Sequence, residues 1–173
     1  MVYTIFLFLI IGQPFGQRST IFARGALIMT IQPLSRDQLA QVTTLLQVAF
    51  IDDPGLQHIC NHHQKGYERR LYACFEAILK MQMVNEQPVF GIIVDGECVA
   101  CAVLTNPNAK LKLSSAFHWT WLALSQTGFR CFWRTIRHVI KISPYQPKYG
   151  HYRLEFIAAH PKHQGKGYGR MLL

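Results

Sequence analysis

The chain has 173 residues, of which half are apolar, 12% aromatic and 16% charged. This length suits one domain of ordinary size, and the apolar fraction excludes a disordered or collagen-like chain. Lys and Arg number 18 against nine Asp and Glu, a formal net charge of +9. From Cys98 to Leu173 there are eleven basic residues and a single carboxylate, Glu155. This half suits an anionic partner such as a phosphorylated small molecule, a nucleic acid or an anionic membrane surface, although a solvated basic surface is equally compatible.

The first 28 residues differ in pattern from the rest. Residues 1–11 are almost wholly apolar, but they are too few to span a bilayer, and they lack the basic residues that begin a secretory signal. Residues 12–25 show no clear period. We expect Met29 to be the true initiator and residues 1–28 to be an extension outside the fold, which leaves residues 29–173 as one domain. A weak signal anchor is the alternative.

Clear local signals begin with a short strand, which is expected over residues 30–34. Ser35 and Gln38 have the spacing of a capping box, and apolar residues then recur at three- and four-residue steps up to Phe50. This pattern predicts a helix. The Asp-Asp-Pro-Gly sequence at 52–55 ends it.

Neither the histidines nor the cysteines form a metal-site pattern. His58 and His62 lie four residues apart, but no carboxylate joins them at a useful spacing, so a partly exposed polar turn is expected here. The five cysteines have no regular framework, which is typical of buried thiols in a reducing compartment. Cys98 and Cys101 fall on a predicted strand, where their odd spacing should direct the thiols to opposite faces. No metal site is expected.

A second helix and a hairpin follow. Apolar residues on one face predict a helix over residues 66–83. Residues 89–94 and 97–104 each read as a strand, and Asp95-Gly96 between them supplies the positive φ angles of a type I′ turn. The sequence therefore predicts an antiparallel hairpin in the middle of the chain.

Residues 114–142 predict one or two helices, interrupted near Gly128. Large aromatic side chains are frequent here. Basic residues recur at steps of three to four: Arg130, Arg134, Arg137 and Lys141. Basic residues between aromatic ones can indicate nucleic-acid binding, but an amphipathic helix with a solvated basic stripe is the favoured interpretation.

The end of the chain carries the pattern with the clearest chemical use. A strand is expected over residues 151–159, Pro161 ends it, and a helix begins at Arg170. Between them stand three glycines at alternate positions: Gly165, Gly167 and Gly169. Glycines let a ligand approach the main chain, and the amides that open a helix have no partner within its first turn. The segment is therefore suited to bind a phosphate or pyrophosphate, and nearby basic residues add charge: Lys162, Lys166 and Arg170.

The spacing matches neither the dinucleotide fingerprint nor the P-loop. It resembles the acetyl-CoA signature of the GNAT N-acetyltransferase superfamily, Gln/Arg-x-x-Gly-x-Gly/Ala. Here the signature reads Gln164-Gly165-Lys166-Gly167-Tyr168-Gly169. The order of predicted elements from about Met29 onward is also that of the family. The resemblance implies an α/β (α+β) fold with a mixed, mostly antiparallel sheet flanked by helices.

The resemblance also implies a cofactor, a reaction and a set of binding residues. The co-substrate would be acetyl-CoA, and its acetyl group would pass to a primary amine of a small molecule or peptide that the sequence does not identify. Backbone groups around Ile157 and Ala159 would pair with the pantetheine arm. Main-chain amides along the signature would hold the pyrophosphate: Gln164, Gly165, Lys166, Gly167, Tyr168 and Gly169. No bound nucleic acid and no stable membrane span are expected, and the location would be cytoplasmic.

Glu155 is the candidate general base. By strand alternation, residues 153, 155, 157 and 159 should share one face, which in the family looks onto the acetyl group. Other members place a Glu or His at one of the first two of these positions. The alternative for Glu155 is a structural ion pair with Arg153 or a neighbouring Arg.

The chain departs from the family at its end, because it stops at Leu173, four residues into the helix after the signature. The family normally continues with a further strand, a helix and closing strands. We therefore expect a truncated reading frame that lacks the C-terminal strand and helix and acetylates poorly. An inactive remnant of an acetyltransferase is the first alternative, and a basic nucleic-acid-binding module is the second.

Overall fold

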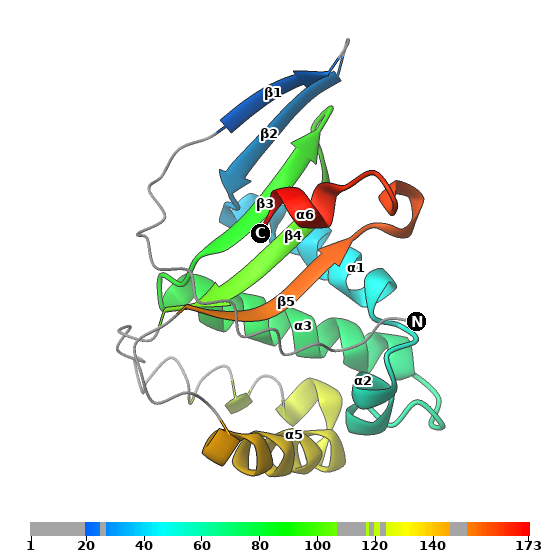
Figure 1. The fold of residues 1–173 in the computed structure, drawn as a ribbon. Coiled ribbons are helices and arrows are strands. Elements are labelled where there is room, and N and C mark those ends of the chain that lie inside the picture. Colours follow the sequence, from blue (N-terminus) through cyan, green and yellow to red (C-terminus); the bar gives the residue numbers. More distant parts are fainter. Residues whose placement is uncertain (1–19, 25–26, 107–116, 118–119, 122–123, 146–151) are drawn as a thin grey trace.

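The computed structural model describes residues 20–24, 27–106, 117, 120–121, 124–145 and 152–173. Its sheet has five strands in the order β1-β2-β3-β4-β5, and each neighbouring pair is antiparallel (Figure 1). The strands are β1 Thr20–Arg24, β2 Leu27–Pro33, β3 Val89–Val94, β4 Glu97–Thr105 and β5 Arg153–Ala159. The α-helices are α1 Leu39–Ala49, α2 Pro54–Ile59, α3 Tyr67–Val84, α5 Phe129–Ile142 and α6 Tyr168–Met171. Three short 3-10 helices are η1 Arg36–Gln38, η2 Ser143–Tyr145 and η3 Pro161–His163.

The sheet has a helical layer on one face and a smaller apolar cluster on the other. The helix-side cluster joins α1 and α3 to the sheet, and Phe75 of α3 is one of its fully buried side chains. The opposite cluster includes Ile92 and Leu104 of the sheet and Leu172, which follows α6. Side chains of β5 pack into both clusters, so both faces of this strand are covered.

Several predicted elements are confirmed. Ser35 and Gln38 form the expected capping box, with a 3.0 Å bond from the Ser35 amide to Gln38 Oε1. The helix expected over 66–83 is α3. Asp95 and Gly96 have φ angles of 49° and 86°, as a type I′ turn requires. The expected mixed, mostly antiparallel sheet is antiparallel throughout the described residues.

The short helix α2 was not expected from the sequence. Its N-cap is Asp53, which is 2% exposed and accepts a 2.9 Å bond from the Leu56 amide. Pro54 follows as the first helical residue, where its missing amide hydrogen costs nothing. The Asp-Asp-Pro-Gly sequence that ends α1 therefore also begins α2. Only the first of these two roles was predicted from the sequence. His58 lies in α2, and the described residues contain no group of three or more possible metal ligands.

The expectation that Cys98 and Cys101 face opposite sides of β4 is wrong. Both side chains are buried in the helix-side cluster, whereas Val99 and Ala100 pack on the other face. The pairing of β3 with β4 shifts between Ile92 and Ile93, which makes Val99 an extra residue in β4. A β-bulge of this kind interrupts the alternation of faces.

The bounds of several elements differ from those expected from the sequence. Residues 1–19 lie outside the described residues, whereas β1 and the first residues of β2 belong to the sheet, within the segment that we expected outside the fold. Residues 114–116, 118–119 and 122–123 also lie outside the described residues, and α5 begins just after Gly128, as expected. The helix α6 begins at Tyr168, two residues earlier than predicted.

No helix within the described ranges is long and apolar enough to cross a membrane.

Candidate functional site

The outer edge of β5 presents backbone groups that do not bond to β4. The His160 amide donates to the Val99 carbonyl at 2.8 Å, next to the pair Ala159–Ala100. In an antiparallel pair the bonded positions alternate, so Ile157 and Ala159 direct their N–H and C=O groups away from β4. Among the described residues no strand pairs with this edge. The two residues proposed from sequence thus carry strand-type bonding groups that an extended ligand could use.

The loop after β5 brings several main-chain amides together. Gly165 and Gly167 have φ angles of 78° and 84°, which L side chains rarely adopt, and a Cβ at either would meet nothing within 4 Å. The Gln164 amide donates to the Pro161 carbonyl at 3.3 Å. Within the described part of the chain, the amides of residues 165–169 donate to no acceptor. Glycine is therefore required here for conformation, and the freed amides are available to an anion.

This loop and the end of β5 line an open cavity of about 500 Å3. The Nε2 of Gln164 donates to the outward-facing Ala159 carbonyl at 3.4 Å. The lining residues are Ala159, His163, Gln164, Gly165, Gly167, Tyr168, Gly169 and Arg170. Most of the residues proposed from sequence therefore meet at one cavity, whereas Ile157, Lys166 and the candidate base Glu155 do not line it.

The charge around this cavity is positive. Lys166 Nζ lies 3.3 Å from His163 Nδ1, and Arg170 lines the cavity. Partial burial, followed by the charges of Lys166 and His160, lowers the pKa of His163 below its ordinary value. An anion in the cavity would stabilise the charged form of each of these groups.

At the other end of β5, Glu155 occupies a β-bulge. Val103 pairs with Phe156 and Leu104 with Leu154, so Glu155 has no partner residue in β4. The bulge therefore changes which residues of β5 face the helices. The side chains of Phe156 and Ala158 pack on the helix side, and those of Leu154, Ile157 and Ala159 pack on the opposite side. The expectation that residues 153, 155, 157 and 159 share one face is therefore wrong, because an extra residue breaks the period of two.

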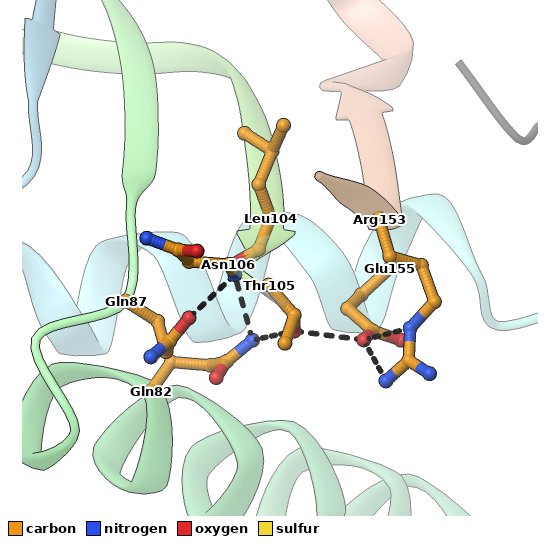
Figure 2. A network of polar contacts seen from close by, with 7 residues as sticks. All are labelled: Gln82, Gln87, Leu104, Thr105, Asn106, Arg153 and Glu155. Carbon is orange, nitrogen blue, oxygen red and sulfur yellow. Dashed lines mark hydrogen bonds and ion pairs between the residues drawn. The ribbon is translucent and has the colours of Figure 1, made fainter. Parts of the chain in front are cut away.

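Glu155 ends a chain of polar contacts that begins in α3 (Figure 2). Its Oε1 accepts a 2.8 Å bond from Thr105 Oγ1 and a 2.6 Å bond from Arg153 Nε, and it forms an ion pair with Arg153 Nη2. Gln82 Nε2 donates to Thr105 Oγ1 at 3.0 Å. The ion pair with Arg153, which was the alternative for Glu155, is thus present. The parts of Gln82 and Thr105 were not found from the sequence, where nothing connects them to Glu155.

Residues 56–173 match the acetyltransferase (GNAT) family, and the chain belongs to this family. A solved structure described as histone acetyltransferase HPA2 and related acetyltransferase, from Corynebacterium glutamicum, is similar to this chain with a TM-score of 0.58. The two are 21% identical, over 83% of this chain and 67% of that one, which shows a shared fold. No curated protein matched the sequence.

Proposed function

We propose that this chain is an N-acetyltransferase that uses acetyl-CoA and transfers its acetyl group to a primary amine of a small molecule or peptide. The observation that carries the proposal is the continuity of the open β5 edge with the loop of free amides and its cavity. An extended arm can pair with β5 while a diphosphate binds at the loop. Membership of the family supports the same reaction.

Each half of the site would bind one part of acetyl-CoA. Ile157 and Ala159 would pair with the pantetheine arm, since their backbone groups point to the open edge. The pyrophosphate would lie against the amides of the signature, and the positive charge of Lys166 would favour it. The signature residues in these roles are Gln164, Gly165, Lys166, Gly167, Tyr168 and Gly169.

In this proposal Glu155 acts as the general base. An amine nitrogen attacks the thioester carbon, the carbon–sulfur bond breaks, and the thiolate of CoA leaves. Glu155 accepts the proton that the nitrogen loses, so nitrogen reaches its neutral amide form. Its side chain is 17% exposed, which allows contact with a substrate while keeping most of the carboxylate away from bulk water. In this proposal the acetyl transfer is accelerated by the close placement of amine and thioester and by general base catalysis.

We also propose a cytoplasmic location. All five cysteines are free, and four of them are buried. Free thiols in this number are typical of a reducing compartment. The boundary of the domain at Met29 and the extension over residues 1–28 remain predictions, which the mass of the native N-terminus would test.

The test is to measure binding and transfer separately. CoA is expected to raise the melting temperature of the purified chain, and acetyl-CoA with a panel of primary amines should give acetylated products detectable by mass spectrometry. AMP, which lacks both the pyrophosphate and the pantetheine arm, is the control ligand. No stabilisation by CoA would contradict the proposed site. Stabilisation without any product would favour the inactive remnant.

A further inference from the structure

Both hydrogens of the Gln82 side-chain amide are used in hydrogen bonds to β4. Gln82 is 5% exposed and projects from α3 towards the end of β4. Its Nε2 donates to the Leu104 carbonyl at 3.4 Å and to Thr105 Oγ1 at 3.0 Å. A side-chain amide nitrogen has two hydrogens, so both are used. The amide orientation is thereby fixed, with its nitrogen towards β4.

The fixed amide determines the direction of the next hydrogen bond. Thr105 has one hydroxyl hydrogen and accepts the bond from Gln82, so its own hydrogen is free to point elsewhere. Glu155 Oε1 lies 2.8 Å from Thr105 Oγ1 and, as a carboxylate, acts as the acceptor. The order of donation is therefore Gln82 to Thr105 to Glu155 (Figure 2).

All the donors to Glu155 among the described residues converge on one oxygen. Thr105 Oγ1 and both guanidinium nitrogens of Arg153 that reach Glu155 bond to Oε1. No donor from the part of the chain that the structure describes bonds Oε2. The ion pair and a catalytic role are thus compatible, because one oxygen is held and the other can accept a proton.

The bulge explains why the Glu155 carboxylate needs hydrogen bonds to fix its orientation. A residue in a regular strand is restrained by the side chain opposite it. Glu155 has no opposite residue in β4, so cross-strand packing does not fix its direction. Thr105 pairs with Arg153 in the register beyond the bulge, and this pairing brings both donors to the carboxylate.

We propose that Thr105 and Gln82 are positioning residues that orient Glu155, so that Oε2 faces the attacking amine. This inference rests on the proposed function. Thr105 acts directly on the carboxylate, and Gln82 acts through Thr105. This role requires no contact between either residue and the substrate.

The experiment compares variants of Thr105 in the full chain, with an amine that the wild type acetylates. Thr105→Val is expected to lower kcat about tenfold, the effect of losing one hydrogen bond to a charged group, with the KM for acetyl-CoA within about twofold of the wild type. Thr105→Ser keeps the hydroxyl and should restore most of kcat. Gln82→Met should lower kcat about threefold, because the hydroxyl of Thr105 would lose its fixed direction.

Two further variants separate positioning from general stability. In Glu155→Gln, the additional change Thr105→Val should cause no further loss of kcat, because the two residues act as one unit. Thr43→Val is the matched control, since Thr43 is a buried threonine whose hydroxyl bonds the Leu39 carbonyl in its own helix. It should leave kcat unchanged. If Thr105→Val fails to fold, Thr105→Ala replaces it.

The outcomes distinguish the two proposals. Absence of turnover by the wild type for every amine would overturn the proposed function. With an active wild type, the positioning role would be overturned by an unchanged kcat in Thr105→Val. It would also be overturned by a Ser variant as slow as the Val variant, or by losses that add in the double variant.

Discussion

The two ends of β5 carry two candidate sites, one formed by main-chain groups and the other by side chains. At its C-terminal end the backbone supplies the groups, and the amides of residues 165–169 are left without partners among the described residues. At its N-terminal end side chains supply the groups, and three donors saturate a single oxygen of Glu155. Free donors suit a ligand that brings its own charge. A restrained carboxylate suits a proton transfer, in which the accepting oxygen must point towards the donor.

This contrast also decides how each end responds to substitution. A backbone site is altered mainly by changing the main-chain conformation or by adding a side chain in the way. A side-chain site is altered by removing a single functional group. The predictions below use this difference, and they begin with the largest expected effect.

Glu155→Gln should lower kcat about 100-fold, because the amide cannot accept the proton of the attacking amine. The stabilisation of the chain by CoA should remain within about twofold in ligand affinity, since the free amides lie at the other end of β5. Steady-state kinetics and thermal denaturation with CoA measure the two quantities. A variant with wild-type kcat would show that Glu155 is not the general base, and only the loop after β5 would keep its proposed role.

Gly167→Val should weaken CoA binding by about tenfold or more, because the side chain strains a φ of 84° and projects from the cavity lining. Gly66→Val is the matched control. Gly66 is also the N-cap of a helix in the left-handed region, with φ 80° and ψ 22° against 84° and 4° at Gly167, and a Cβ added there would make only an ordinary contact with Arg70. Both variants should lose similar stability, whereas calorimetry should show weaker CoA binding for Gly167→Val alone. Equal losses of affinity would show that the loop acts through stability.

Lys166→Ala should weaken CoA binding about threefold at low salt, and the difference should shrink as ionic strength rises. Lys166 lies beside His163 but does not line the cavity, so its contribution is through charge. Lys141→Ala on α5 is the control for net charge alone. If both variants bind equally well, the charge of Lys166 plays no part in the site.

The smallest expected effect is a dependence of CoA affinity on pH through His163. Its pKa is lowered in the free protein by partial burial and by Lys166. A bound diphosphate favours the charged ring and raises this pKa, so binding takes up a proton. Affinity should therefore increase about twofold as pH falls from about 7.5 to about 5.5. His163→Gln corrects for titration of the ligand, and a pH dependence as steep in this variant would contradict the assignment.

The parts of the fold that follow from local signals were predictable. Asp95-Gly96 specifies its turn by the φ angles that it accepts, and the capping box at Ser35 acts within four residues. The glycine-rich loop belongs with these, because Gly165 and Gly167 adopt conformations that depend on their own lack of a side chain.

The failures arise where the period of a strand is interrupted. The faces of Cys98 and Cys101 and those of residues 153–159 were both derived from strict alternation, and in both cases a bulge adds a residue. A bulge is fixed by pairing with a neighbouring strand, and one strand's sequence contains little sign of it. Likewise Gln82 and Thr105 are 23 positions apart, and only the packing of α3 beneath β4 brings them together.

The bulge at Glu155 has a consequence for how this strand can evolve. It divides β5 into two short segments of opposite phase, each with its own set of neighbours. Changes before the bulge alter what surrounds the carboxylate, and changes after it alter the edge and loop. The side chains of the first segment can therefore change while the second segment keeps its backbone geometry.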